Sequence, residues 1–258
     1  MSFLIGLLAG VFGGLVGVGG GVVMIPLMVR LFGFQQHQAH GTSLAALVFT
    51  GLTGAAAYSL KDNVDYGAAV FLAATAMITA RFGALYANSL PEWRLKRFFS
   101  IFVICVSILL LLKPFYAPIT PPPGRVLWMA ILLLSGLASG FIAGLMGVGG
   151  GAIMVPAMVL FLGFSQYLAQ GSSLLAMVPA GAVGAYTHWR LGNMVMTIVP
   201  GLIGGIIVGA FAGGTLAQWL SEATLRLIFA AALIWMGVRD IRKSTHLRNV
   251  SLKDALEV

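Results

Sequence analysis

Two glycine runs are the residues best suited to chemistry in this sequence. They are Gly17-Val18-Gly19-Gly20-Gly21 and Gly147-Val148-Gly149-Gly150-Gly151, each inside a long apolar stretch. Each glycine weakens a helix by about 1 kcal/mol relative to alanine, so such a run predicts a helix break. Where a broken helix restarts, its free N–H groups and positive dipole end suit an anion. We expect a substrate site that uses the backbone of Gly19, Gly20, Gly21, Gly149, Gly150 and Gly151.

Close helix packing is the alternative interpretation of glycine in an apolar segment. Gly6, Gly10 and Gly14 are spaced four residues apart, as are Gly136, Gly140 and Gly144. This small-xxx-small spacing is typical of helices whose backbones touch in a membrane. We expect these six glycines to serve packing and the two runs to serve the site.

Hydroxyl and amide side chains follow each glycine run at matched positions. Thr42-Ser43 and Ser172-Ser173 each come directly after a glycine near the start of the next apolar element. Their hydroxyls could donate to an oxyanion, or they could cap the helix N-terminus. His40 and Gln170 stand just before these pairs and are candidate site donors; the alternative is that they are interfacial polar residues.

Arg81 is a further candidate for anion binding. It falls inside an apolar element, where an ionisable residue is costly and usually functional. The position 130 residues later is Phe211, so the arginine has no matching partner. Arg81 could bind the substrate or extend its side chain to the membrane surface, and the sequence leaves both open.

The composition shows which elements must position these residues. Hydrophobic residues make up 59% of the 258 and charged residues only 9%, and mean hydropathy is +0.99. Soluble domains carry about 25% charged residues. Several apolar stretches reach the roughly 20 residues that span a bilayer. The chain is therefore predicted to be a polytopic membrane protein. Its net charge of +8 is attributed to basic cytoplasmic loops, with no nucleic-acid partner.

An internal duplication underlies the matched positions. Shifting the chain by 130 residues aligns Gly6–Leu44 with Gly136–Leu174, and 21 of these 39 positions are identical. Met24 and Pro26 in the first copy match Met154 and Pro156 in the second. The sequence therefore predicts two related transmembrane repeats, residues 1–112 and 126–238. A proline-rich linker at residues 113–125 joins them, and a basic cytoplasmic tail at residues 239–258 follows.

The predicted fold is all-α, with four apolar elements in each copy. The first element is too long for one crossing, so it must break at the glycine run. If the chain turns back there, the repeat is inverted; if it crosses, the repeat is parallel. Without the tail, the lysines and arginines divide 5 against 4 or 4 against 5 between the two sides, so their count barely discriminates. Inversion is slightly favoured, and both versions place the two termini in the cytoplasm.

The acidic residues bear on the kind of transport. All seven acids fall in predicted loops or in the tail. No carboxylate is then left in the bilayer core to bind Na⁺ or relay a proton. No metal site, cofactor or catalytic set can be assembled, and the single cysteine, Cys105, is expected to be a packing residue. We expect no enzyme. Proton coupling through a histidine or through the substrate, and a homo-oligomer, are left open.

The doubled motif resembles that of a known family. The two Gly-Val-Gly-Gly-Gly segments followed by Pro26 or Pro156, and the Gly-Thr-Ser-Leu and Gly-Ser-Ser-Leu starts, look like those of the TauE/SafE permeases. The resemblance covers about Gly6 to Val238. It implies a bacterial or archaeal cytoplasmic-membrane transporter of sulfite or organosulfonate anions, often in the export direction.

Three functions remain after the sequence analysis. The preferred one is a secondary carrier of small sulfur oxyanions that alternates access around the paired glycine breaks. The second is an anion channel with the same amide-lined constriction. The third is a thiol-dependent membrane protein that uses Cys105. The exact anion, the direction and the coupling ion do not follow from the sequence.

Overall fold

Helices account for all the regular structure in the described residues. The computed structural model describes residues 1–86, 92–112 and 124–254. Most of the predicted linker, residues 113–123, and the last four residues lie outside this part of the chain. The helices are α1 (Ser2–Val16), α2 (Gly21–Phe32), α3 (Gln36–Ser59), α4 (Tyr66–Tyr86), α5 (Glu92–Leu112), α6 (Arg125–Met146), α7 (Gly151–Phe161), α8 (Gln166–Arg190), η2 (Met196–Ile198, a 3₁₀ turn), α9 (Val199–Ala217) and α10 (Glu222–Asp254).

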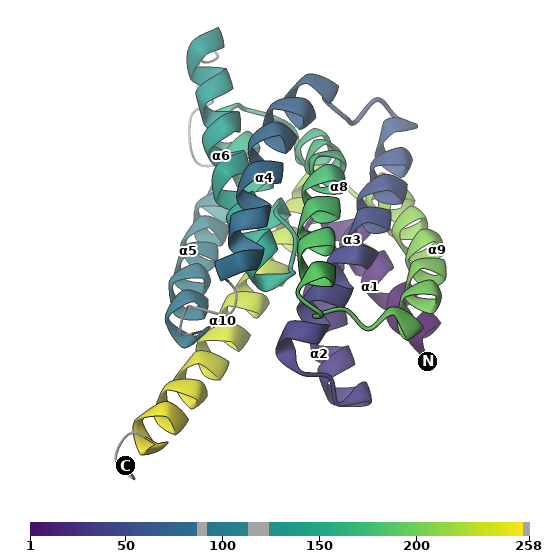
Figure 1. Cartoon of the computed structure of the whole chain (residues 1–258). Coiled ribbons are helices and arrows are strands. Elements are labelled where there is room, and N and C mark those ends of the chain that lie inside the picture. The colour runs from purple at the N-terminus through teal and green to yellow at the C-terminus, as the bar shows by residue number, and fades with distance from the viewer. Residues whose placement is uncertain (87–91, 113–123, 255–258) are drawn as a thin grey trace.

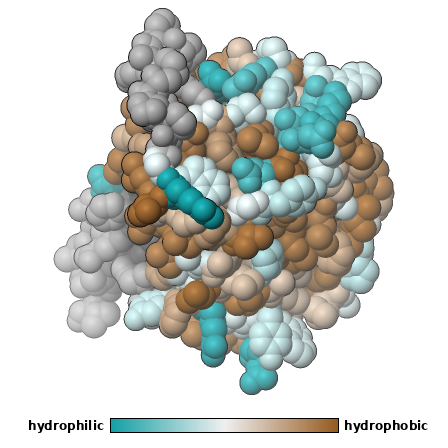
Figure 2. Space-filling view, turned by 90° about the horizontal axis from the view of Figure 1, so that it is seen from above, coloured by the Kyte–Doolittle hydropathy of each residue, from teal (hydrophilic) through white to brown (hydrophobic). Residues whose placement is uncertain are grey.

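The membrane class predicted from composition is confirmed. Among the described helices, five are long and apolar enough to cross a bilayer: α3, α4, α6, α8 and the segment Met196–Ala217. Large apolar side chains such as Val70, Ile78 and Leu134 are exposed on the outer surface. Figure 2 shows hydrophobic residues reaching the rim of the molecule, with hydrophilic residues in patches on the end face. An outer surface of this kind is suited to lipid.

Both long first elements break at their glycine runs, as predicted. α1 ends at Gly17 and α6 at Gly147, and both glycines have the left-handed backbone that ends a helix. α2 restarts after Gly20 and α7 after Gly150. Each half of the chain therefore contains five helices where the sequence analysis expected four elements.

The last element of each half is longer than expected. α5 runs over 21 residues from Glu92 to Leu112, and α10 continues from Glu222 to Asp254, beyond the predicted end of the second repeat at residue 238. Residues 239–254 contain no glycine or proline, so nothing in their sequence interrupts the helix. Much of the predicted tail is thus part of α10, including Arg239 and Asp240.

Spaced glycines bring four helices into backbone contact. A side chain on Gly6, Gly10 or Gly14 would collide with the backbone of α9, near Leu202 and Ala210. A side chain on Gly136, Gly140 or Gly144 would collide with the backbone of α4, between Leu72 and Ala80. The packing role predicted for these six glycines is confirmed. In each pair, the residue numbers at the contacts increase in the same direction along both helices. α1 therefore runs parallel to α9, and α6 runs parallel to α4.

The centre of the molecule is formed by α3 and α8, which run antiparallel. Gly51 lies against Leu174 and Val178, and Gly184 lies against Leu44 at the other end of the contact. Figure 1 shows α8 and α9 joined at the lower end, where both chain termini also lie. α9, and with it α1, therefore runs in the same direction as α3. To connect α1 to α3 the chain must turn back through α2, which makes α1 and α2 a hairpin that enters the molecule and returns.

Candidate functional site

The two glycine breaks, Gly17–Gly20 and Gly147–Gly150, pack against each other inside the molecule. We call them the first and the second break. Gly19 has φ of 91° and Gly149 has φ of 95°, backbone angles that favour glycine. A side chain on Gly21 would collide with the carbonyl oxygen of Gly147, and one on Gly151 with that of Gly17. Close packing is thus one role of the runs, in addition to the break itself.

The helices that start at the breaks have uncapped N-termini. Gly20 and Gly150 are the N-cap residues of α2 and α7, and neither end receives a side-chain cap. The amide of Gly150 lies 3.2 Å from the sulfur of Met177. The first N–H groups of a helix have no partner inside the helix, so these two ends supply hydrogen-bond donors in the interior.

The hydroxyl groups predicted to meet substrate are bonded to the backbone in this structure. The Ser43 hydroxyl is 2.9 Å from the carbonyl of Gly147, and that of Ser173 is 3.1 Å from the carbonyl of Gly17. Each serine therefore ties one half of the chain to the break of the other. Each hydroxyl also lies 2.8 Å from a carbonyl of its own helix, at residue 40 or 170.

The neighbouring hydroxyls bind loops. Thr42 accepts a hydrogen bond from the amide of Val195 at 3.1 Å, and Ser172 accepts one from the amide of Asp65 at 2.8 Å. None of the four hydroxyl residues caps a helix, because α3 and α8 begin six or seven residues earlier, after Gln35 and Ser165. The N-cap alternative is therefore wrong.

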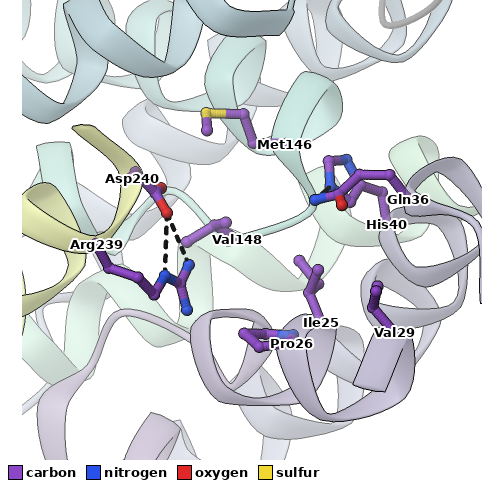
Figure 3. Close-up of a pocket in the computed structure, with 9 residues that line it drawn as sticks. All are labelled: Ile25, Pro26, Val29, Gln36, His40, Met146, Val148, Arg239 and Asp240. Atoms are coloured by element: carbon purple, nitrogen blue, oxygen red, sulfur yellow. Dashed lines mark hydrogen bonds and ion pairs between the residues drawn. The ribbon is translucent and has the colours of Figure 1, made fainter. Parts of the chain in front are cut away.

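A cavity that opens to the surface lies beside α2, the helix in which the chain returns after the first break. We call it the open cavity. Its volume is about 210 Å³, which holds several water molecules or a small anion. Figure 3 shows its walls from α2, the start of α3, the second break and α10. It is lined by Ile25, Pro26, Val29, Gln36, His40, Met146, Val148, Arg239 and Asp240.

Arg239 and Asp240 are the charged pair of the open cavity. The guanidinium Nε and Nη2 of Arg239 each lie 3.0 Å from one carboxylate oxygen of Asp240. Nη1 donates to the carbonyl of Val22 at 3.0 Å, and the guanidinium also lies over the ring of Trp235. That carbonyl lacks a helical partner, because Pro26 four residues later has no N–H. Arg239 therefore fastens α10 to the kinked α2.

Sequence reasoning missed these two residues. Asp240 is only 4% exposed, so the expectation that every acid lies in a loop or tail is wrong for this one. Pairing with Arg239 is the usual condition for burying a carboxylate. The signal that could have found the pair is the uninterrupted helical sequence after Val238.

His40 lines the open cavity, as the site prediction requires. Its Nδ1 lies 3.3 Å from the carbonyl of Leu145 and its Nε2 lies 3.2 Å from the amide nitrogen of Gln36. A carbonyl can only accept, so Nδ1 carries the proton and Nε2 accepts from Gln36. His40 is thereby held at both ring nitrogens next to the second break.

Gln170 occupies the matched position in the other half but meets no cavity. It is fully buried, and its carbonyl oxygen accepts a hydrogen bond of 2.6 Å from the Tyr58 hydroxyl. Its side chain lies against Gly17 in the first break. His40 and Gln170 thus each contact the break of the opposite half.

Arg81 and Cys105 are not brought to the breaks. Both side chains are exposed, Arg81 on α4 and Cys105 on α5. The expectation that Cys105 is a packing residue is wrong, because its side chain is exposed. Within the described ranges, no group of three or more His, Cys, Asp or Glu side chains is placed to bind a metal.

The space next to the second break is nearly filled. A void of about 10 Å³ touches Gly149, Gly150 and Met177, and this is scarcely room for one water molecule. The uncapped end of α7 therefore has no room for an anion in this conformation.

A family model settles the family. The model described as "Sulfite exporter TauE/SafE" matches residues 2–239. The chain belongs to the TauE/SafE family. It is 30% identical over 272 residues to the probable membrane transporter protein YunE of Bacillus subtilis, covering 93% of this chain and 98% of that protein. It is also 30% identical to a probable membrane transporter protein of Xylella fastidiosa, covering 90% of each chain. No solved structure matches the chain. As a member of this family, the protein is a membrane transporter with several passes through the bilayer.

Proposed function

We propose that this protein is a secondary transporter of small sulfur oxyanions, such as sulfite or an organosulfonate, and that it exports them. The observation that carries the proposal is the open cavity beside the glycine breaks, with Arg239, His40 and Gln36 in its wall. The anion enters this cavity and moves to the uncapped helix ends at the breaks. The family's printed description, sulfite exporter, supports the substrate class and the direction.

The chemistry of the open cavity supports an oxyanion. A guanidinium has five N–H donors. Among the described residues, Arg239 uses three of them, one on each nitrogen, for Asp240 and Val22, and one hydrogen on Nη1 and one on Nη2 remain for a ligand. A planar pair of such donors matches two oxygens of a sulfite or sulfonate group. The amide of Gln36 adds a neutral donor on the opposite wall (Figure 3).

Membrane topology follows from the same proposal. We propose that residues 1–112 and 126–238 are inverted copies, supported by the antiparallel run of α3 and α8 and by the return of the chain through α2. Arg81 apart, 10 lysines and arginines then fall toward the end that holds both termini, against 4 toward the other end. By the positive-inside rule this end, and with it the open cavity, faces the cytoplasm of a cell inner membrane. Arg81 lies five residues before Tyr86, the end of α4 nearest this side, which supports a side chain that extends to the interface.

A carrier is favoured over the channel that uses the same constriction. The cavity has room on one side of the breaks, while Gly149 and Gly150 are enclosed. Alternating access requires the two sides to open in turn, and inverted copies provide two arrangements of similar free energy. Proton coupling, if present, would use His40 or the substrate itself.

The first experiment is thermal stabilisation of the purified protein by anions. The panel contains sulfite, sulfate, thiosulfate, sulfoacetate, taurine, nitrate and acetate at matched ionic strength. A ligand that binds the folded state raises the melting temperature with concentration. We expect a selective rise with one sulfur oxyanion. A flat panel contradicts the substrate class.

A charge-balanced variant tests the site. Arg239→Gln combined with Asp240→Asn removes the cation without leaving a buried carboxylate unpaired. We expect the anion-induced shift to be lost. Arg242→Gln is the control, since Arg242 is exposed on the same helix, and should keep the shift. An undiminished shift in the double variant overturns the placement of the site.

Proteoliposomes separate the carrier from the channel. A carrier coupled to a proton gradient accumulates the anion against its own gradient, whereas a channel only dissipates that gradient. Uphill accumulation is expected, and its absence under every imposed gradient would favour the channel.

A further inference from the structure

The open cavity has a closed counterpart at the positions related to it by 130 residues. These counterpart positions are Val16, Val18, Leu109, Leu110, Val155, Pro156, Val159, Gln166 and Gln170. All of them except Leu109 are buried. In the open cavity, by contrast, Pro26, Val29, Gln36 and Arg239 are partly exposed. The same set of positions therefore forms a hollow on one side and a packed wall on the other.

Polar atoms are trapped in the closed counterpart. Gln166 and Gln170 are both fully buried. In the described part of the chain, Nε2 and Oε1 of Gln166 and Nε2 of Gln170 have no hydrogen-bond partner. Leaving such atoms unpaired in the interior costs free energy that pairing with water or a ligand would return. Opening this wall would allow water or a ligand to pair with these polar atoms.

α2 and α7, the helices in which the chain returns after each break, also differ in how closely they are packed. α7 packs against α5, and the backbone amide of Gln166 is bonded to Glu222 at the start of α10. α2 packs less closely against α10, and Arg239 links the two helices through its hydrogen bond to the carbonyl of Val22. Because α3 and α8 run antiparallel, Gln36 and Gln166, each in the first turn of its helix, lie toward opposite ends of the molecule.

We propose that Gln166 and Gln170 line a second anion-binding cavity, closed in this structure, which opens on the face opposite the open cavity. This proposal rests on the alternating access proposed above. In the opposite conformation α5 withdraws from α7, and the two carboxamides donate their N–H groups to the oxyanion.

The second cavity differs from the first in charge. Where the open cavity has Arg239 and Asp240, the counterpart positions are Leu109 and Leu110. The carboxamides of Gln166 and Gln170 are neutral, and the charged pair nearest to them is Glu222 with Arg226, since Glu222 accepts hydrogen bonds from the backbone amide of Gln166 at 3.2 Å and from Arg226 at 2.8 Å.

Cysteine labelling from each side of the membrane tests the second cavity. The background is Cys105→Ala, which removes the single native thiol. Gln36→Cys and Gln166→Cys are treated with a membrane-impermeant maleimide in right-side-out and in inverted vesicles. We expect Gln36→Cys to react from one face and Gln166→Cys from the opposite face. Ser107→Cys, a buried position on α5 outside both sets, should react from neither.

The labelling pattern decides the matter without any substrate. Failure of Gln166→Cys to react from either face, or reaction from the same face as Gln36→Cys, overturns the second cavity. Because no anion is added, a flat anion panel would defeat the proposed substrate class and leave this test intact. A selective anion panel with an inert Gln166→Cys would defeat the second cavity alone.

Gln166→Leu provides a second readout. Leucine fills a similar volume without polar atoms, so the closed wall loses its unpaired groups. We expect the melting temperature to rise by about 2–4 °C while the transport rate falls at least tenfold. A purely structural glutamine would give a rate that follows stability. A Gln166→Leu protein that transports at the wild-type rate would contradict the proposal.

Discussion

Around the first break, α2 leaves a hollow toward α10, whereas around the second break the matching helix α7 is packed against α5. The backbone of the two breaks is nearly the same, since φ is 91° at Gly19 and 95° at Gly149. Ser43 and Ser173 each donate a hydrogen bond to a carbonyl of the opposite break, and we call these two bonds the serine clamps. They are also alike, with hydroxyl-to-carbonyl distances of 2.9 and 3.1 Å. The two breaks are therefore alike, and the difference lies in the side chains and helices that surround them.

Substitution of Gly21 or Gly151, the glycines at which the two breaks touch each other, should have the largest effect on stability. The effect should be equal in the two halves. In Gly21→Ala and Gly151→Ala the new methyl group meets a backbone carbonyl that cannot move aside. We expect each to destabilise the protein by roughly 3 kcal/mol or more, seen as loss of monodisperse protein in size-exclusion chromatography. Gly184→Ala, whose methyl group would meet only the Leu44 side chain at 3.2 Å, should be tolerated. Survival of only one of Gly21→Ala and Gly151→Ala would contradict the equivalence of the breaks.

Gly19→Ala and Gly149→Ala should differ, and so sharpen the comparison. Both force a positive φ on alanine, at a cost of about 1–3 kcal/mol. At Gly19 the methyl group lies 3.0 Å from the end of the flexible Leu47 side chain, but at Gly149 it collides with the carbonyl of Val18. Chemical unfolding in mild detergent should rank Gly149→Ala as the less stable. Equal stability would show that the second break has room to relax.

The serine clamps should give a smaller effect that is again symmetric. Ser43→Ala and Ser173→Ala each remove a hydrogen bond between the halves, worth about 1 kcal/mol. The expected fall in melting temperature is about 2–4 °C for either variant. Thr53→Ala is the matched control, because that hydroxyl bonds within its own helix, to Phe49 at 2.7 Å. A serine variant no worse than this control would mean that the clamp is dispensable.

Cys105→Ala should have the smallest effect. The side chain is exposed on α5 and touches neither break nor cavity. We expect a change in stability within about 0.5 kcal/mol and an unchanged transport rate in proteoliposomes. Loss of transport would revive the thiol-dependent function considered from the sequence.

The breaks and the packing glycines could be predicted because they depend on local physics. A glycine run ends a helix whatever surrounds it, and four-residue spacing marks one helix face. The partners of the polar residues could not be predicted in the same way. Ser43 meets a carbonyl 104 residues away and Arg239 one 217 residues away, and neither distance leaves a pattern in one sequence. Asp240 was assigned to a tail because burial of a paired carboxylate is a property of the folded neighbourhood. Gln166 could not be predicted as a site residue, because only its burial without a side-chain hydrogen-bond partner distinguishes it from other glutamines.

The contact between α1 and α9 has a consequence for biosynthesis. The glycine face of α1 fits against the backbone of α9, but Gly10 and Ala210 are about 200 residues apart in the chain. At ribosomal rates of about 5–20 residues per second, α1 waits roughly 10–40 s for that partner. During this interval it is a 15-residue helix, too short to span a bilayer stably on its own. The packing of α1 is thus completed only after about 200 further residues have been synthesised, and until then its place in the bilayer depends on other contacts.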